Sequence, residues 1–354
     1  MGLGVGILGF AHGHVGAYIA QWREHPEYGI EVVAGWDHDA ARLEKNVAPL
    51  QVRACATVQE LLADAAVQAV VITSETARHA DLVEQAAAAG KAIILQKPIA
   101  LNVSQANRVV AAVNRAKVPF TMAWQMRVDP QNLKMKELLA GDDFGKVFQV
   151  RRRHCLGAHV WGAWFLDSWH VSPTENRDIW ADDAAHAVDF IHWLLGVPET
   201  VTAEIDSLWN PKMPMDNGFA IYRYAGGPVA EVSSSFTCVA GENTTEIVAE
   251  KGTIIQNYGD GPSCGVPRPA DACGLKWFMA GAKDWVCSDI ASPPNHGPRI
   301  AGLALPLAEF LNGRRPAIAT AAEGLTTLRM TLGCHLSTRL GRRVAIHDPA
   351  IDNV

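Results

Sequence analysis

The sequence lacks any uninterrupted run of about 18 apolar residues, the length that a membrane-spanning helix requires. We therefore expect no transmembrane helix and no membrane partner. The first apolar run begins at Val5, which leaves no room for a signal peptide, so a cytoplasmic protein is expected. Charged residues are also scarce, at 19% of the chain, and the net charge of −6 gives no reason to expect nucleic acid as a partner.

Paired cysteines are absent as well. The seven cysteines are scattered at positions 55, 155, 238, 264, 273, 287 and 334, with no C-x-x-C pair. Their odd number and spacing favour reduced thiols and no zinc or other metal site. The only compact basic run is Arg151–Arg153, and on a strand its side chains alternate between faces, so it cannot form one patch.

What the sequence does contain is a strand, a glycine and a helix near its start. Val5–Leu8 is apolar, Gly9 follows, and a helical pattern begins near Val15. A glycine turn that leads into a helix N-terminus suits a dinucleotide pyrophosphate. Aligned with G-x-G-x-x-G, the three glycine positions hold Gly9, Ala11 and His14. The expected cofactor contacts in this turn are Gly9, Phe10, Ala11, His12 and Gly13, although His12 and His14 can equally be polar residues of an exposed turn.

An acidic residue follows the second apolar run. Asp37 comes directly after the predicted strand Glu31–Trp36 and 28 residues after Gly9, close to the spacing of the acid that hydrogen-bonds an adenosine ribose. An acid here favours NAD over NADP, while His38 and Arg42 weaken that preference. The alternative is that Asp37 caps the helix that follows it. We include Asp37 and His38 in the predicted cofactor site.

The first third of the chain continues to alternate between strands and helices, which predicts a doubly wound parallel sheet. Ligands of such sheets bind beyond the carboxyl ends of the strands. Thr73, Ser74, Gln96 and Lys97 stand at such ends, and the cofactor site is expected to include them together with His79. The strands are expected at Ala69–Thr73, Ala92–Leu95 and Pro119–Ala123, and the helices at Ala77–Ala89 and Val103–Ala116.

The pattern changes after about Lys146, where strands follow one another with a single helix among them. We expect an open, mostly antiparallel sheet with one helix on a face, an irregular stretch over 258–298, and two closing helices. A dinucleotide-binding domain is thus predicted over 1–124. A substrate-binding and oligomerisation domain is predicted over 125–354, with closing helices that pack back on the first domain. A first, long strand is expected to begin at Gly145. Further strands are expected at Val201–Leu208, Gly218–Tyr224, Val229–Phe236, Thr245–Glu250 and Thr253–Gln256. The helices are expected at about Asp182–Leu195, Ile300–Leu311 and Thr320–Leu340.

Three residues are candidates for acid–base chemistry. The ammonium of Lys97 can hydrogen-bond a substrate hydroxyl and stabilise a developing alkoxide, unless it is an ordinary surface lysine. Asp182 and His186 are spaced i,i+4, which predicts one helix face. An imidazole beside a carboxylate can accept the proton of an alcohol. The alternatives are a core histidine at 186 and a helix-start charge at Asp182, like that of Asp183.

Aromatic residues gather between His159 and Trp180. Indole rings stack on the C–H faces of sugars, but they also pack at domain or subunit interfaces. The stretch holds a single arginine, Arg177, so a neutral polyhydroxylated ring is the expected substrate. Arg127 or Arg151–Arg153 would have to reach the pocket to hold a sugar acid. The aromatic residues are Trp161, Trp164, Phe165, Trp169, His170 and Trp180; the predicted substrate contacts are Trp124, Arg127, Trp164, Trp169, His170, Asp182 and His186.

Together these features resemble the Gfo/Idh/MocA family of sugar and cyclitol oxidoreductases. The family's E-K-P is Gln96-Lys97-Pro98 here, its D-x-x-x-H runs from Asp182 to His186, and W-L-L-G follows at Trp193–Gly196. The resemblance implies a Rossmann domain, a C-terminal α/β domain with an open sheet, a bound nicotinamide nucleotide, and a homodimer or homotetramer built through that sheet. It also implies that Lys97 and His186 are the catalytic pair, that Asp182 positions the substrate or tunes the histidine, and that the Lys97–Pro98 peptide is cis.

The sequence departs from the family pattern at Gln96, at Ala11 and over 176–181, where a glycine-rich run is usual. The leading hypothesis is an NAD-dependent dehydrogenase that oxidises a secondary hydroxyl of a sugar or cyclitol. Two alternatives share the fold: an enzyme that uses NAD transiently to cleave glycosides, and a regulator that senses a nucleotide without catalysis. Retention of both Lys97 and His186 argues against the regulator.

Overall fold

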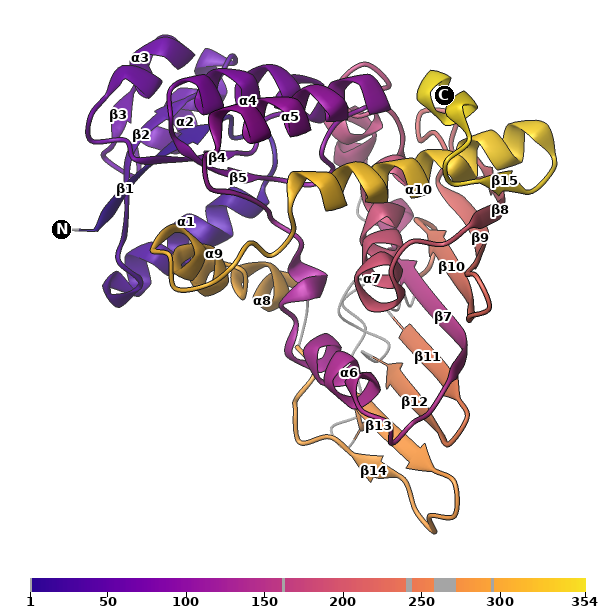
Figure 1. The fold of residues 1–354 in the computed structure, drawn as a ribbon. Helices are drawn as coiled ribbons and strands as arrows, with labels where there is room; N and C mark the ends of the chain where they lie inside the picture. The colour runs from indigo at the N-terminus through magenta and orange to yellow at the C-terminus, as the bar shows by residue number, and fades with distance from the viewer. Residues whose placement is uncertain (1, 161–162, 240–243, 258–271, 294–295) are drawn as a thin grey trace. The chain divides into compact units, whose positions relative to one another are not determined.

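The computed structural model describes residues 2–160, 163–239, 244–257, 272–293 and 296–354. Trp161 and Cys264, both named above, lie outside these residues. The chain divides into two compact units (Figure 1). The N-terminal unit contains Met1–Gln125, Thr174–Asn176 and Ile300–Leu328, and the C-terminal unit contains Met126–Pro173, Arg177–Arg299 and Arg329–Val354. Each unit is described by itself.

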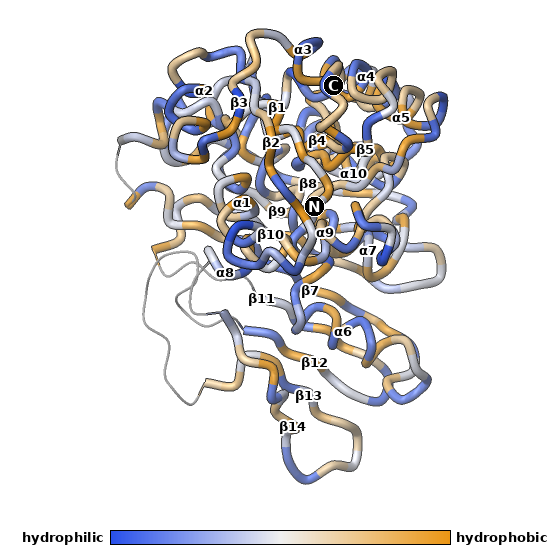
Figure 2. Tube along the Cα trace, turned by 90° about the vertical axis from the view of Figure 1, so that its left-hand side faces the viewer, coloured by the Kyte–Doolittle hydropathy of each residue, from blue (hydrophilic) through white to orange (hydrophobic). Residues whose placement is uncertain are grey.

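The N-terminal unit is built on a six-stranded sheet in the order β3-β2-β1-β4-β5-β6, with every neighbouring pair parallel. This is the strand order of the dinucleotide-binding doubly wound fold, which confirms the predicted class. The central strands are apolar throughout, as Figure 2 shows for β4 and β5, because helices cover a parallel sheet on both faces. The strands are β1 (Leu3–Leu8), β2 (Ile30–Trp36), β3 (Arg53–Ala54), β4 (Ala69–Ile72), β5 (Ala92–Leu95) and β6 (Phe120–Met122).

Some helices of this unit begin at polar caps, provided by Asp39, Thr57 and Asn102. Asn102 accepts a hydrogen bond from the N–H of Gln105 and starts α5, which ends at Lys117 in a left-handed conformation. Asp39 caps α2, so the interpretation of Asp37 as that cap is wrong. The indole of Trp22 in α1 donates to the carbonyl of Ala304 in α9 at 2.8 Å. The helices are α1 (His14–Glu24), α2 (Ala40–Val47), α3 (Val58–Ala63), α4 (His79–Ala88), α5 (Val103–Ala116) and α9 (Ala304–Leu311).

The C-terminal unit holds a nine-stranded sheet in the order β14-β13-β12-β11-β7-β10-β9-β8-β15. Only β7 and β10 pair in parallel among its described strands, so the mostly antiparallel sheet is confirmed. The strands are β7 (Val147–Cys155), β8 (Thr200–Asp206), β9 (Asn217–Arg223), β10 (Val229–Ser235), β11 (Thr244–Ala249), β12 (Gly252–Asn257), β13 (Leu275–Met279), β14 (Val286–Cys287) and β15 (Val344–Ala345).

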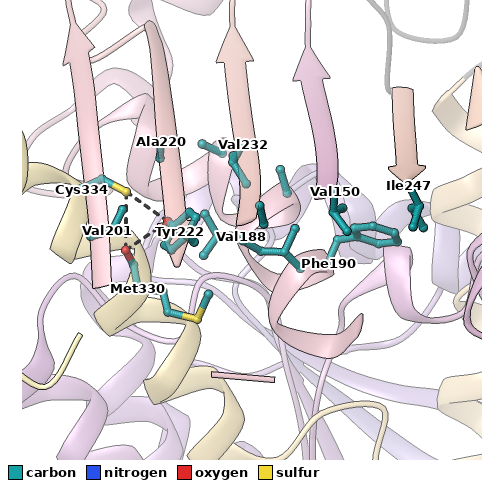
Figure 3. Packing of buried hydrophobic residues seen from close by; sticks show 14 of the residues in the cluster. Val150, Val188, Phe190, Val201, Ala220, Tyr222, Val232, Ile247, Met330 and Cys334 are labelled. Atoms are coloured by element: carbon teal, nitrogen blue, oxygen red, sulfur yellow. Dashed lines mark hydrogen bonds between the residues drawn. The ribbon is translucent and has the colours of Figure 1, made fainter. Parts of the chain in front are cut away.

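Helix α7 (Ala185–Leu195) packs against β7 and β10 of this sheet and forms the core of the unit. Figure 3 shows Val188 and Phe190 from α7 among Val150 of β7 and Val232 of β10, all fully buried. At the other end of this core, the Tyr222 hydroxyl lies 3.2 Å from the Met330 carbonyl of α10. The remaining helices are α6 (Pro130–Ala140), α8 (His296–Ala301) and α10 (Ala321–Leu340), whose first part belongs to the N-terminal unit.

Four expectations need correction. Strands β13 and β14 lie within 258–298, which was expected to be irregular. Their antiparallel pairing brings Cys273 and Cys287 together as a disulfide, with Cα atoms 5.9 Å apart, so the expectation of reduced thiols is wrong for this pair. The mid-chain helix opens with a π-helical turn, Trp180–Ala184, ahead of α7.

The closing helix expected at Ile300–Leu311 is two helices, α8 and α9. Among the described residues, no helix has the length and hydropathy needed to cross a bilayer.

Candidate active site

The glycine turn after β1 is shaped by contacts that only a glycine permits. Gly9 has a φ of +88°, and a Cβ atom there would lie 2.5 Å from the Cα of Ser74. The Thr73 hydroxyl donates to the Gly9 carbonyl at 2.6 Å, and the His12 N–H donates to the Thr73 carbonyl at 2.9 Å. The ends of β1 and β4 are thereby joined at the point where the strand order reverses, which is where dinucleotides bind in this fold.

The carboxylate of Asp37 is buried and saturated with donors. Its Oδ2 accepts from the Phe10 N–H and from Arg42 Nε, both at 2.7 Å, and its Oδ1 accepts from Arg42 Nη2 at 2.8 Å and the Asp39 N–H at 2.9 Å. Burial raises the pKa of Asp37, but these hydrogen bonds outweigh it and hold the pKa below its usual value. A carboxylate offers about four acceptor positions, so a ribose hydroxyl can reach Asp37 only if Arg42 gives up its own contacts.

Arg42 is in turn held by a second acid. Its Nη2 donates to Glu75 Oε1 at 2.7 Å, and His38 Nδ1 lies 3.3 Å from Asp37 Oδ1. Two acids, one guanidinium and one imidazole therefore meet beside the glycine turn.

Gln96 links the turn to β5. Its side chain is fully buried; Oε1 accepts from the Tyr18 hydroxyl at 3.2 Å, and Nε2 lies 2.8 Å from His14 Nδ1 and 3.3 Å from His12 Nε2. The expectation that the strand ends share one rim is confirmed by these contacts. His12 is 4% exposed, so the alternative of a fully exposed histidine is wrong for it.

Lys97 follows directly, and its peptide bond to Pro98 is cis, as expected. Lys97 is 2% exposed, so it is no ordinary surface lysine. His79 sits behind this turn, with Nδ1 2.8 Å from the Pro98 carbonyl and Nε2 3.2 Å from the Ser74 carbonyl. Burial lowers the pKa of His79 to about 4, so its ring is neutral near pH 7 and holds the turn rather than carrying charge.

In the C-terminal unit, both carboxylates of the π-helical turn lie beside histidines. Asp182 Oδ2 lies 2.8 Å from His170 Nδ1. The neighbouring Asp183 places Oδ1 3.9 Å from His186 Nε2 and Oδ2 2.9 Å from His154 Nε2. The i,i+4 spacing predicted Asp182 on the face of His186, and the structure places a further carboxylate, Asp183 at the i,i+3 spacing, near this histidine. Turns of the π-helical type are frequent at functional sites.

The arginines of this unit are largely engaged. Arg127 is buried and forms a two-bonded pair with Asp189, at 2.9 and 2.8 Å. In β7, Arg152 points into the core and donates to Thr245 and Gln256, while Arg151 and Arg153 are exposed, which confirms the expected alternation. Arg127 is thus committed to Asp189 rather than free to hold a substrate carboxylate.

The aromatic stretch splits into exposed and buried parts. Trp164 is 63% exposed, and Trp169 stacks on His170 with ring centroids 4.0 Å apart. Trp180 is buried in the core of the C-terminal unit, and Trp124 is buried in the N-terminal unit. Trp180 is therefore a packing residue, and Trp169 and His170 form the part of the stretch that combines a stacked ring with a polar group.

The sequence did not identify Arg42 as the partner of Asp37, did not single out His154, and indicated Asp183 only as a helix-start charge. A signal for His154 existed: it stands two residues after Arg152, so a strand places both on the same, inner face. A signal for Asp183 existed as well, because its i,i+3 spacing from His186 places both on one helix face.

The fold and the turn at Gly9 define a dinucleotide-binding protein of the Rossmann class. Residues 3–123 match the family model described as an oxidoreductase family with an NAD-binding Rossmann fold, and residues 132–255 match the GFO/IDH/MocA C-terminal domain. The chain belongs to the Gfo/Idh/MocA oxidoreductase family, which confirms the resemblance.

Curated relatives carry dehydrogenase names. Inositol 2-dehydrogenase 3 of Saccharopolyspora erythraea is 27% identical over 64% of this chain and 65% of its own length. An inositol 2-dehydrogenase of Gluconacetobacter diazotrophicus is 29% identical over 58% of each chain. This chain thus spans less than two thirds of the length of these relatives.

Solved structures share the fold over the whole chain. A levoglucosan dehydrogenase in complex with NADH and levoglucosan has a TM-score of 0.81 at 18% identity, covering 98% of this chain and 100% of that one. An oxidoreductase domain protein from Kribbella flavida has a TM-score of 0.83 at 18% identity, covering 98% and 100%.

Proposed function

We propose that this protein is an NAD-dependent dehydrogenase that oxidises a secondary hydroxyl of a sugar, sugar derivative or cyclitol. The observation that carries the proposal is the buried Lys97 in its cis turn at the end of β5, on the rim that the glycine turn also borders. A buried ammonium beside a dinucleotide site is suited to hold an alcohol oxygen and to stabilise the alkoxide that develops there. The inositol dehydrogenase names of the relatives support the same chemistry.

NAD fits the residues of the N-terminal unit. Gly9 has a positive φ, and a Cβ atom there would lie 2.5 Å from Ser74 Cα, so the turn needs a glycine at this position; the N-terminus of α1 follows the turn. Gly9, Phe10, Ala11, His12 and Gly13 would hold the pyrophosphate. When bound, the cofactor supplies a hydride acceptor.

We assign the adenosine ribose to Asp37 and His38, with Thr73, Ser74, Gln96 and Lys97 along the rest of the rim. His79 contributes by donating its single ring N–H to one of two carbonyls, that of Pro98 or that of Ser74, which lie 2.8 and 3.2 Å from its ring nitrogens. A ribose without a 2′-phosphate suits an acid at position 37, which supports NAD as the cofactor.

The proton chemistry falls to Lys97 and His186. Lys97 holds the hydroxyl oxygen, and His186 accepts its proton as the hydride leaves the carbon. His186 is 2% exposed, and the Asp183 carboxylate 3.9 Å from its Nε2 stabilises the imidazolium that results. Asp182 fixes the His170 ring through its 2.8 Å contact, and that ring stacks on Trp169 and on Phe165.

We propose a neutral polyhydroxylated ring as the substrate, bound by Trp124, Arg127, Trp164, Trp169, His170, Asp182 and His186. The pairing of Arg127 with Asp189 supports a neutral ligand, because it neutralises the buried cation that would otherwise attract a carboxylate.

We also propose a homodimer or homotetramer formed through the sheet of the C-terminal unit. Strand β9 exposes Phe219 at 62% and Ile221 at 48%, and Phe148 of β7 is 46% exposed. Light scattering of the purified protein tests this, and a monomer that stays monomeric at tens of micromolar would contradict it.

A screen of matched inositols, sugars and sugar acids with NAD, read as NADH formation, tests the function. We expect net NADH to accumulate with a neutral ring in proportion to product. Glycoside cleavage without net NADH would show the transient use of NAD instead. A sugar acid preferred by more than about tenfold in kcat/KM, about 1.4 kcal/mol, would overturn the neutral ring.

A further inference from the structure

Two histidines and one carboxylate of the C-terminal unit meet at a single point. His154 comes from β7, Asp183 from the π-helical turn and His186 from the first turn of α7. One ligand atom of each lies within 4.8 Å of the others. His154 is fully buried and His186 is 2% exposed, while the side chain of Asp183 is 14% exposed. Two segments that are separate in the sequence, β7 and the π-helical turn that leads into α7, thus converge on a nearly dry position.

His154 provides a second and independent observation. Its ring is completely buried, and within the described part of the chain neither ring nitrogen makes a hydrogen bond. Its Nε2 lies 2.9 Å from Asp183 Oδ2, but the contact lacks the geometry of a hydrogen bond. Buried imidazoles almost always satisfy at least one nitrogen, so this ring is expected to have a further partner. A separation of about 3 Å is also the spacing of adjacent ligands on one metal ion with bonds of about 2.1 Å.

We propose that His154, Asp183 and His186 form a binding site for a divalent transition-metal ion of the Zn²⁺ type. Two imidazoles and one carboxylate are the three-ligand set that Zn²⁺ accepts with one position left open. Imidazole nitrogen disfavours Mg²⁺ and Ca²⁺, which prefer oxygen ligands. Tetrahedral ligands lie about 3.4 Å apart, and these ligand atoms lie within 4.8 Å of one another, so the widest pair has to close by up to about 1.4 Å when the ion binds. The site replaces the expectation from the sequence that the chain binds no metal.

The site has a consequence that rests on the proposed function. A metal ion takes the lone pair of the ligating nitrogen of His186, and an imidazole bound in this way cannot accept the proton of a substrate hydroxyl. The metal-bound protein is therefore inactive as a dehydrogenase, and the ion acts as an inhibitor at the catalytic histidine.

The binding test uses the full-length protein after dialysis against a chelator. Isothermal titration with ZnCl₂ is expected to give one site per chain, and Co²⁺ in its place is expected to give the visible absorption of a low-coordinate N/O site. His154→Gln and Asp183→Asn each remove one ligand with little change in shape, and each is expected to weaken Zn²⁺ binding at least tenfold. The matched control is His170→Gln, a nearby histidine that contacts Asp182 instead.

The outcomes distinguish the proposed metal site from the proposed proton-accepting role of His186. No Zn²⁺ binding, or binding that His154→Gln and Asp183→Asn leave unchanged, overturns the site. Equal weakening in His170→Gln overturns it too, because the ion would then sit elsewhere. If binding occurs as expected, turnover should fall by about tenfold at a free Zn²⁺ concentration ten times Kd. Full turnover in the Zn²⁺-saturated protein would leave the site standing and contradict the proton-accepting role of His186.

Discussion

Replacement of Gly9 by alanine is the sharpest test of the dinucleotide turn. An alanine at a φ of +88° has unfavourable contacts between its Cβ and its own backbone, at a cost of about 1–2 kcal/mol. The new Cβ would also lie 2.5 Å from Ser74 Cα, 2.6 Å from Ser74 Cβ and 2.7 Å from Ser74 N. These atoms belong to the backbone or are directly attached to it, so rotation of a flexible side chain cannot relieve the overlap.

Relief requires the end of β1 and Ser74 to move apart by about 1 Å, and the overpacking of a rigid site typically costs about 1–3 kcal/mol. We therefore expect Gly9→Ala to lower the free energy of unfolding by about 3 kcal/mol. The same movement displaces the Thr73 hydroxyl from the Gly9 carbonyl, which it contacts at 2.6 Å. NADH binding should weaken with it.

Gly13→Ala provides the matched control for stability. Gly13 lies in the same turn, but its φ is −59° and a Cβ there has nothing within 4 Å. A change of less than about 1 kcal/mol is expected for glycine to alanine at this helix start, because the loss of a favoured N-cap residue and the lower entropy of the unfolded chain oppose each other. Urea unfolding followed by tryptophan fluorescence measures both variants. If Gly9→Ala lies within about 1 kcal/mol of Gly13→Ala, the steric account of the turn is wrong.

Three further predictions concern chemistry, cofactor choice and pH. Lys97→Ala and His186→Ala should each lower turnover by about 100-fold or more while the Kd for NADH stays within threefold. Asp182→Asn should lower turnover by less. A variant with near wild-type turnover would show that the replaced residue takes no part in the proton chemistry. Arg42→Ala should strengthen NADH binding relative to NADPH binding, because the change frees the acceptor positions of Asp37 and removes a cation that would attract a 2′-phosphate. Fluorescence titration with both nucleotides measures the two Kd values. A shift of the preference toward NADPH would contradict the prediction. The His79 ring has a pKa of about 4 in the folded protein, whereas the unfolded chain takes up a proton at this histidine below about pH 6.5. The free energy of unfolding of the wild type should therefore fall by up to about 3 kcal/mol as the pH drops from about 6.5 to 4. His79→Gln should show a shallower fall, and an equal dependence of stability on pH in both proteins would refute the assignment.

Local pattern predicts the N-terminal sheet well for a physical reason. A strand buried on both faces is a short, continuous apolar run, so Ala92–Leu95 is predicted with the bounds that the structure has. The helix Val103–Ala116 is also predicted with its observed bounds, because its apolar residues recur at helical spacing. The end of each strand then follows from its first polar residue, which brings Thr73 and Gln96 to the same rim. Positions that depend on backbone periodicity alone could thus be read from the sequence.

Pairings between side chains that are distant in the sequence could not be predicted in this way. The partner of Asp37 is Arg42, which the sequence suggested only as a nearby cation, and the partner of Arg127 is Asp189, 62 residues away. Asp183 of the π-helical turn lies beside His154 of the distant strand β7, and no local spacing predicts that pairing. The sequence around β13 and β14 is rich in glycine and proline and did not predict these two strands. Two short strands joined by a disulfide can form with little apolar periodicity.

The departures at His14 and Gln96 are better understood together than separately. A glutamate at position 96 would offer acceptors only, and it could not donate to the ring nitrogens of His12 and His14. The amide of Gln96 does both: its oxygen accepts from Tyr18, and its nitrogen faces His14 Nδ1 at 2.8 Å and His12 Nε2 at 3.3 Å. Because Tyr18 is completely buried, burial raises the pKa of its hydroxyl far above the usual value, so it remains a donor at every relevant pH. A neutral residue at 96 therefore suits a neutral, hydrogen-bonded partner set. The histidine in the third glycine position and the missing negative charge beside Lys97 are two parts of one polar network.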